Sequence, residues 1–186
     1  MIECEKKMLI SKEDYECLME RYGLDNDSNL KALVKQVNYY FDTDDLLMNS
    51  KNTTCRIRLE DGKYQATLKQ HSKSSDFSTE TDMEIFDGLI DNAFTAMGLK
   101  LQGELTTYRC IIFRDAHCEV VLDKNEYLNC EDYELEVEYE DMFAQDAYRI
   151  IKEITDLLNI ETPHNIPSSK SMRFFERKLH KKEEIV

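Results

Sequence analysis

Apolar residues recur at two different spacings along the chain. In several short runs every second residue is apolar, which is typical of half-buried β-strands. In others the apolar residues return every three or four positions, which is typical of amphipathic helices. The runs with the strand pattern are residues 1–9, 37–47, 53–60, 63–70, 76–85, 106–114, 118–125 and 132–140.

The predicted helices are residues 11–21, 88–99, 144–160 and 169–179. Ser11 followed by Asp14 resembles a capping box, and Gly23 is a suitable residue for ending the first helix. Ser168 is the expected cap of the last helix. Asp61-Gly62 supplies the turn of a hairpin between residues 53 and 70. Because most strands are joined by short connections, we expect antiparallel pairing and the α+β class.

Composition narrows the kind of protein without identifying it. The 186 residues carry a net charge of −14, which argues against a protein that coats a nucleic acid duplex with basic residues. A local basic pocket could still bind an anion. There is no run of 18 apolar residues and no export signal, so we expect no membrane segment and a cytoplasmic location. The sequence fixes no oligomeric state, and a homodimer is one open alternative.

Cysteine and histidine give no sign of a zinc site. The six cysteines are scattered without a C-x-x-C pair, and no histidines cluster near them. The four histidines, His71, His117, His164 and His180, are isolated polar residues that we expect at the surface. The aromatic stretches "NYYF" and "RFF" are expected to pack helices and barrel ends rather than to stack on bases.

Charged residues of one sign share a face on several predicted strands. Arg56 and Arg58 project to one side, and so do Glu134, Glu136 and Glu138 on a later strand. Three glutamates in a row repel each other unless a cation lies among them. An antiparallel sheet with one solvated face would also alternate in this way. The pattern therefore leaves a wet outer face and a charged interior both open.

If the charged faces looked inward, they would form a site for a polyanion. Arginines bind phosphate oxygens through a planar fork, and lysines bind them as point charges. Carboxylates cannot bind phosphate directly, but they bind hard cations such as Mg²⁺ or Mn²⁺ that bridge to phosphate. The basic residues that would contact phosphate are Arg56, Arg58, Lys69 and Arg109.

The segment "ECEKK" contains the pattern E-x-E-x-K in Glu3, Glu5 and Lys7. Here the chain resembles the CYTH domain family, the triphosphate tunnel metalloenzymes, and in particular its bacterial branch. An ordered series of later segments is also similar to that branch: Tyr39–Asp45, Cys55–Lys69, Leu105–Arg109, Val121–Tyr127, Tyr133–Asp141 and Ser169–Phe174. The resemblance spans nearly the whole chain.

The resemblance implies a closed eight-stranded antiparallel β-barrel, a tunnel with a charged interior and flanking helices. One domain would cover residues 1–180, and residues 181–186 would form a frayed tail. The implied cofactor is Mg²⁺ or Mn²⁺, with metal ligands Glu3, Glu5, Glu136 and Glu138. The implied triphosphate-binding residues are Lys7, Arg56, Arg58, Lys69, Arg109, Lys170 and Arg173. The residues implied for the catalytic step are Glu5, Glu80 and Glu136.

Three further acids have less definite implied roles. Glu134 and Glu84 are additional candidates for the metal set, and Asp123 is implied to be structural or to support a ligand. The segment around Glu80 departs from the family pattern, because Thr79 and Thr81 stand where many members carry an arginine.

The implied reaction is metal-dependent hydrolysis of inorganic tripolyphosphate or of an organic triphosphate. The family also contains adenylate cyclases and thiamine triphosphatases, so those activities are alternatives on the same scaffold. A non-catalytic module that binds polyphosphate or nucleotides is a third alternative. We expect a triphosphate-containing small molecule as partner, and neither a nucleic acid duplex nor a membrane.

Overall fold

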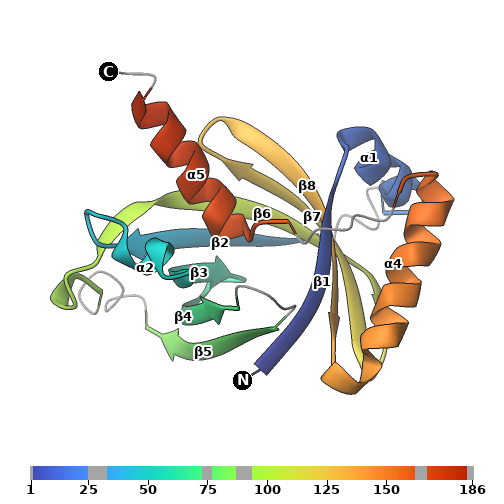
Figure 1. Ribbon diagram of the computed structural model, residues 1–186, viewed down its shortest axis with the longest axis horizontal. Coiled ribbons are helices and arrows are strands. Elements are labelled where there is room, and N and C mark those ends of the chain that lie inside the picture. Colours follow the sequence, from blue (N-terminus) through green and yellow to red (C-terminus); the bar gives the residue numbers. More distant parts are fainter. Residues whose placement is uncertain (1, 25–32, 73–76, 87–93, 162–166, 184–186) are drawn as a thin grey trace.

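Eight strands form a closed antiparallel barrel in the computed structural model (Figure 1). The structure describes residues 2–24, 33–72, 77–86, 94–161 and 167–183, and the side chains of this part apart from residues 2, 3 and 181–183. The strands follow the order β1-β5-β4-β3-β2-β6-β7-β8 around the barrel. Their bounds are β1 (Ile2–Ile10), β2 (Leu33–Asp42), β3 (Thr53–Glu60), β4 (Lys63–His71), β5 (Phe77–Ile85), β6 (Lys100–Arg114), β7 (Cys118–Tyr127) and β8 (Cys130–Tyr139).

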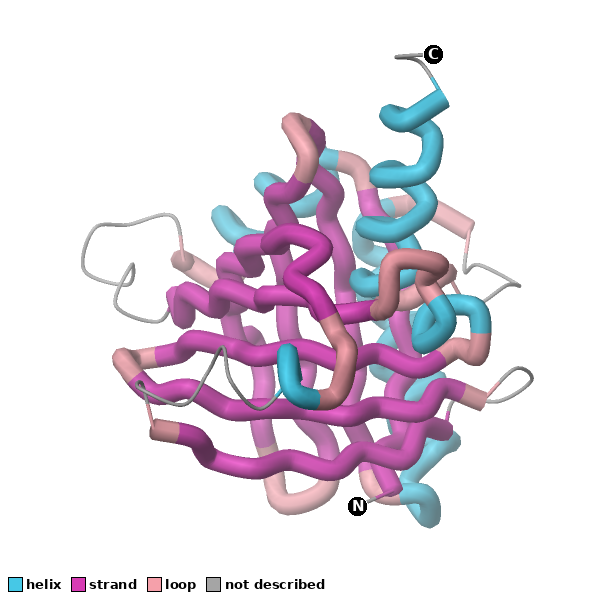
Figure 2. The backbone as a smooth tube through the Cα atoms, turned by 90° about the vertical axis from the view of Figure 1, so that its left-hand side faces the viewer, coloured by secondary structure: helices cyan, strands magenta, loops and turns pink. Residues whose placement is uncertain are grey.

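The predicted fold class is confirmed, and each predicted strand overlaps an observed one. The strand expected within residues 37–47 starts earlier, at Leu33, and ends at Asp42, where the expected polar turn begins. Figure 2 shows the wall of the barrel, in which one group of strands crosses in front of another that runs at a steep angle to it. β1 closes the barrel, because it pairs with β8 along most of its length and with β5 near its first residues. β6 begins at Lys100, earlier than expected, and its first residues pair with β2.

Two tight turns fix the register of the neighbouring strands. Asp61 and Gly62 have φ angles of 48° and 74°, the left-handed conformations that a two-residue hairpin of this kind requires. Leu128 and Asn129 adopt similar angles of 46° and 59° between β7 and β8. Because register decides which face each side chain occupies, these turns place the charged residues of four strands.

The helices are α1 (Lys12–Arg21), α2 (Leu47–Ser50), α4 (Ala144–Leu158) and α5 (Lys170–Glu183), with a 3₁₀ turn η3 (Asp141–Phe143) before α4. The predicted capping box is present in α1: the Asp14 backbone N–H donates to Ser11 Oγ over 3.0 Å, and the Ser11 N–H donates to the Asp14 carboxylate over 3.4 Å. Residues 88–93 of the helix predicted over 88–99 lie outside the described residues. Of the described half, residues 94–96 are helical.

The start and end of α5 correct two expectations. The cap is Ser169 rather than Ser168, because the Met172 N–H donates to Ser169 Oγ and the Arg173 N–H donates to the Ser169 carbonyl. The helix continues to Glu183, beyond the predicted end at residue 179. The added residues are mainly lysine and glutamate, which favour the helical conformation and include no residue that would stop it.

The main apolar core lies outside the barrel wall. Met8, Leu122 and Leu135 stand side by side on β1, β7 and β8 and point away from the tunnel. Leu18 of α1 and Ile154 of α4 belong to the same buried cluster. Figure 1 shows both helices on this side of the barrel. The apolar face of these strands therefore lies on the outside of the barrel, where α1 and α4 cover it, and their charged face points into the tunnel.

A second apolar cluster fixes α5 against the barrel. Phe174 packs on Tyr40 of β2 with ring centroids 5.1 Å apart, and Phe175 lies 6.0 Å from the same ring. Gly103 of β6 makes this contact possible, since a Cβ atom there would lie 2.7 Å from Phe174 Cζ. The predicted packing role of the aromatic stretches is seen in this cluster.

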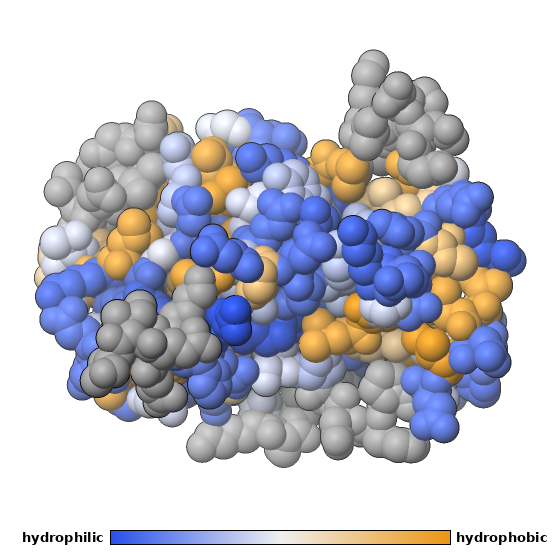
Figure 3. All heavy atoms as spheres, turned by 90° about the horizontal axis from the view of Figure 1, so that it is seen from above, coloured by the Kyte–Doolittle hydropathy of each residue, from blue (hydrophilic) through white to orange (hydrophobic). Residues whose placement is uncertain are grey.

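The coloured part of the face seen in Figure 3 is largely hydrophilic. Seen from above, a band of hydrophobic residues lies toward the right-hand end, which carries α1 and α4 (Figure 3). Within the part of the chain that the structure describes, no helix combines the length and the apolar content needed to cross a membrane.

Candidate active site inside the barrel

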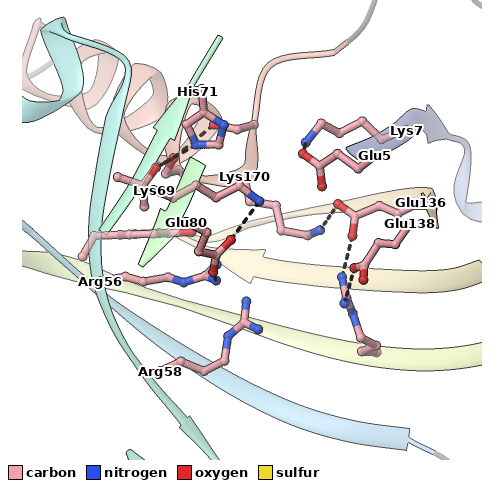
Figure 4. A pocket seen from close by; sticks show the side chains of 15 residues that line it. Glu5, Lys7, Arg56, Arg58, Lys69, His71, Glu80, Glu136, Glu138 and Lys170 are labelled. Carbon is pink, nitrogen blue, oxygen red and sulfur yellow. Dashed lines mark hydrogen bonds and ion pairs between the residues drawn. The ribbon is translucent and has the colours of Figure 1, made fainter. Parts of the chain in front are cut away.

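A cavity of about 180 Å³ lies inside the barrel, lined by inward-facing side chains from β1, β2, β3, β4, β5, β6 and β8 and by the first residues of α5. Its cationic lining residues are Lys7, Arg56, Arg58, Lys69, Arg109 and Lys170. Its anionic lining residues are Glu5, Glu80, Glu136 and Glu138. Figure 4 shows Arg56 and Arg58 reaching in from one wall and Glu136 and Glu138 from the opposite one.

The register explains why these residues meet. Residues that pair directly across an antiparallel sheet point to the same face. Glu5 pairs with Glu138, Lys7 with Glu136, and Lys69 with Glu80. Of the two arrangements that the sequence left open, the structure therefore has the charged interior.

Arg109 joins three acids on neighbouring strands. Its guanidinium donates to both carboxylate oxygens of Asp123 over 3.0 and 2.8 Å, to Glu136 over 2.5 Å and to Glu138 over 3.0 Å. Burial alone would lower the pKa of Arg109, but the charges of these acids raise it well above its usual value. Asp123 has no exposed surface, and this bidentate contact is consistent with its predicted supporting role.

Lys170 enters the tunnel from the first turn of α5. Its Nζ lies 2.6 Å from Glu136, 2.9 Å from Asp123 and 3.0 Å from Glu134. Burial lowers its pKa, but the three carboxylates outweigh burial and the net pKa is raised. Lys170 is therefore a buried cation held entirely by acids of β7 and β8.

The remaining acids are also paired with cations. Lys7 Nζ donates to Glu5 over 2.5 Å, while Glu80 lies 3.2 Å from Arg56 and 3.3 Å from Lys69. Burial raises the pKa of Glu5, but the charges of Lys7 and Lys69 outweigh it and the net pKa is lowered.

The carboxylate of Glu136 is ionised at neutral pH for the same reason. Burial opposes its charge, yet Lys170, Arg109 and Lys7 hold its pKa well below the usual value.

Arg58 differs from the other cations of the cavity. Its Nε donates to Asn38 Oδ1 over 2.9 Å, and among the described residues no carboxylate forms an ion pair with it. Burial and the nearby charges of Arg56 and Arg109 lower its pKa. In addition, Arg56 Nε is buried without a hydrogen-bond partner in the described part of the structure. These two arginines have donors available for an anion.

Two predicted site residues are not among the described lining of the cavity. Arg173 lies outside it, where its guanidinium donates to Asp132 and Glu134, each over 2.9 Å, and to the Ser168 carbonyl over 2.6 Å. It fastens α5 to β8. Glu3 belongs to β1, but its side chain lies outside the described part of the structure.

Several neutral residues of the cavity were not singled out from the sequence: Tyr40, Thr54, His71, Ser169 and Ser171. Alternation contained the signal for two of them, since Thr54 shares a face with Arg56, and His71 shares a face with Lys69. His71 is therefore a lining residue rather than the isolated surface residue that we expected. Burial and the charges of Lys69 and Lys7 lower its pKa to about 4, so the imidazole is neutral at pH 7.

The donors suit a hard divalent cation in kind. They are carboxylate oxygens, the ligands that Mg²⁺ and Mn²⁺ prefer. Among the described side chains, however, no three acidic, imidazole or thiol groups converge on one point, because each carboxylate is turned toward a cation. A metal would share these carboxylates only if phosphate took over their cations.

The comparisons with known proteins agree with this architecture. Residues 1–169 match the model of the CYTH domain family. YjbK of Bacillus subtilis (strain 168), a candidate triphosphatase, is 28% identical in an alignment of length 192 that covers 95% of this chain and 96% of YjbK. The family match ends one residue before α5, so Lys170 and Arg173 lie outside it.

Two solved structures share the fold. The crystal structure of a candidate adenylate cyclase from Bacillus halodurans is 27% identical, covers 93% of this chain and 97% of that chain, and has a TM-score of 0.71. The structure of HpAC1 from Hippeastrum, a candidate adenylyl cyclase with a dominant triphosphatase activity, is 19% identical, covers 94% and 95%, and has a TM-score of 0.72.

Proposed function

This chain belongs to the CYTH domain family, and from that premise we propose that it hydrolyses a triphosphate bound inside the barrel, with Mg²⁺ or Mn²⁺ as cofactor. The substrate is inorganic tripolyphosphate or the triphosphate group of a small organic molecule. The relative YjbK is named as a candidate triphosphatase, and this chain aligns with it over nearly its whole length, which supports this assignment.

The observation that carries the proposal is the state of Arg58. A partly buried guanidinium close to Arg56 and Arg109 is unfavourable unless an anion joins it, and here no described carboxylate forms an ion pair with it. The buried Nε of Arg56 lacks a partner beside it. A phosphate oxygen would satisfy both arginines through charge-assisted hydrogen bonds. The cavity is thus cationic in a chain whose net charge is −14.

The cofactor would be held by acids of β1 and β8. Glu5, Glu136 and Glu138 face one another across these strands, and Glu3 is the fourth predicted ligand. A bound divalent cation supplies charge neutralisation for the phosphates and a more acidic water for attack. When a triphosphate occupies Arg109, Lys7 and Lys170, the carboxylates that these cations now bind become available to the metal.

The protein's own side chains would perform the rest of the reaction. The cations hold the triphosphate and balance the charge that builds up on it in the transition state. Glu80 would orient the attacking water and accept its proton, once Arg56 and Lys69 turn to the substrate. No covalent intermediate with the protein is required.

Hydrolysis fits the cavity better than cyclisation of a nucleotide. A volume of about 180 Å³ is below the roughly 300–1,000 Å³ typical of pockets for drug-sized ligands. The described lining is charged or polar apart from the ring of Tyr40, which Phe174 and Phe175 cover. Among these described lining residues, a nucleobase would therefore find no exposed apolar surface against which to stack.

A non-catalytic anion-binding module is less consistent with the lining. Four carboxylates inside the cavity repel a polyanion and would weaken simple binding. They become useful when a metal stands between them and the phosphates.

The six cysteines are all free thiols, as a reducing compartment would keep them, which supports the expected cytoplasmic setting.

The test is phosphate release from tripolyphosphate, ATP and thiamine triphosphate, each with Mg²⁺, Mn²⁺ or EDTA. We expect release that requires a metal and that EDTA stops. Binding of tripolyphosphate with no turnover of any of the three would favour the binding module. A cyclic nucleotide as the product from ATP would favour the cyclase.

A further inference from the structure

Four polar side chains connect β4 to the start of α5 through the wall of the cavity. His71 Nε2 lies 3.1 Å from Thr54 Oγ1, which lies 2.6 Å from Ser171 Oγ. Ser171 Oγ lies 3.0 Å from Ser169 Oγ. The three hydroxyl-bearing residues are each less than one-tenth exposed. Figure 4 shows His71 on the same side of the cavity as Lys69.

These serines flank Lys170. Ser169 caps α5, and Ser171 bonds to β3, so the backbone of Lys170 is held between two tethered residues. The other end of Lys170 binds acids of β7 and β8. The side chain thus spans the tunnel, with its backbone fixed on one wall and its ammonium on the other.

When the imidazole of His71 is neutral, each of the three hydroxyl groups in this hydrogen-bonded series can donate one hydrogen bond. In a consistent order, Ser169 donates to Ser171, Ser171 to Thr54, and Thr54 to His71 Nε2. Ser169 Oγ accepts the Met172 N–H at the other end. Burial and the charges of Lys69 and Lys7 lower the pKa of His71 to about 4, so the imidazole is neutral at pH 7, and Nε2 accepts in the tautomer that carries the proton on Nδ1.

We propose that His71, acting through Thr54 and Ser171, is a positioning residue that fixes Lys170 for binding the triphosphate. The proposal rests on the function proposed above, because it gives Lys170 a phosphate-binding role. It adds an anchor on β3 and β4 to the one on β8, where Arg173 donates to Asp132 and Glu134. Without the Thr54–Ser171 bond, α5 keeps the β8 anchor and the contacts of Phe174 and Phe175 with Tyr40, but its first turn loses this bond to β3.

The informative variants change Thr54, which has no charge and lies between the two partners. Thr54→Val keeps the shape of the side chain but removes the hydroxyl that links His71 to Ser171, whereas Thr54→Ser keeps this hydroxyl. Thr53→Val on the same strand is the matched control, since Thr53 bonds to Gln70 on the exposed face and not to α5. His71→Leu and His71→Gln form a second pair, in which glutamine retains an acceptor for Thr54.

Two readouts separate this inference from the proposed function. The first is the rate at which an amine-reactive reagent labels Lys170, measured by mass spectrometry without substrate. The second is the steady-state kinetics of tripolyphosphate hydrolysis. If the wild-type protein hydrolyses no triphosphate, the proposed function fails, while the labelling of Lys170 still decides whether the chain positions it.

We expect Thr54→Val and His71→Leu to label faster at Lys170, and to lose about 10²-fold in kcat/KM, mainly through KM, because a shift of about 1 Å in a binding group has this cost. Thr54→Ser and His71→Gln should recover most of both properties. Labelling of Lys170 at the wild-type rate in Thr54→Val would overturn the proposal. Equal acceleration in Thr53→Val would also overturn it, because the effect would then be a general loosening.

Discussion

Lys170 Nζ lies 2.6 Å from Glu136 Oε1, which joins a predicted phosphate-binding cation directly to a predicted metal-binding acid. Arg109 with Glu138 and Lys7 with Glu5 form ion pairs of the same kind. Without a ligand, the two halves of the site neutralise each other. On the proposed function, a metal–triphosphate complex would offer a partner to each half, so its binding would replace these ion pairs rather than fill an empty charged cavity.

Arg58 and Arg109 should differ in how much stability is lost with their charge. Arg58→Met breaks no ion pair with a described carboxylate but removes the donor to the buried Asn38 Oδ1, so we expect a loss of about 1–3 kcal/mol in the free energy of unfolding. Arg109→Met leaves Asp123, Glu136 and Glu138 without their shared cation. Breaking a buried pair of this kind costs about 3–5 kcal/mol. Urea unfolding of both variants measures the contrast, and equal destabilisation would contradict the charge assignment.

Glu5→Gln should separate binding from catalysis. We expect hydrolysis of tripolyphosphate to fall roughly 10²-fold, the size of effect seen when groups that support a metal are altered. Binding of tripolyphosphate in EDTA should not weaken, because the variant removes a negative charge from the cavity. Glu119→Gln is the control, since Glu119 faces inward but pairs with Arg114 outside the cavity lining. Full activity in Glu5→Gln would show that Glu5 is not a metal ligand.

His71 should make stability depend on pH in a defined window. Its pKa is about 4 in the folded protein against 6.5 when unperturbed, so the unfolded state binds more protons between these values. The stabilisation is therefore complete above pH 6.5 and declines as the pH falls toward 4. We expect His71→Gln to lack this decline when the free energy of unfolding is measured across the window. An NMR titration that places the pKa of His71 near 6.5 would contradict the expectation.

Gly103→Ala should loosen the contact between α5 and the barrel. The added Cβ would lie 2.7 Å from Phe174 Cζ, and the φ angle of 145° is one that side chains rarely adopt. We expect a loss of about 1–3 kcal/mol in the free energy of unfolding, as for overpacked sites. Adding Phe174→Leu to Gly103→Ala should recover part of the loss. Purely additive effects would show that the two residues do not meet.

Two-residue periodicity predicted the inward face of this barrel well. Arg56 and Arg58 on β3 face the cavity, as do Glu136 and Glu138 on β8, because alternation alone decides which side a residue occupies once the strand is placed. Periodicity could not decide whether the charged face of these strands lines a tunnel or faces the solvent. That choice depends on the apolar outer face packing against α1 and α4, which involves residues far apart in sequence.

The missed features depend on contacts between distant elements. His71 reaches the cavity because β4 pairs with β3. It is linked to Ser171 through Thr54, and Thr54 and Ser171 are 117 residues apart in sequence. The role of Gly103, in the early part of β6, appears only when Phe174 packs on it. Likewise, no local pattern showed that Arg173 would bind Asp132 and Glu134 instead of lining the tunnel.

The most direct test of the central claim is a calorimetric titration of tripolyphosphate, in EDTA, into the wild-type protein and Arg58→Met. We predict one site per chain in the wild type, and an affinity at least about tenfold lower in the variant, since a charge-assisted hydrogen bond contributes about 1.5–3 kcal/mol. Both proteins should be folded under the conditions of the titration, which urea unfolding checks. Equal affinity of both for tripolyphosphate would contradict the claim that the triphosphate binds inside the barrel at Arg58.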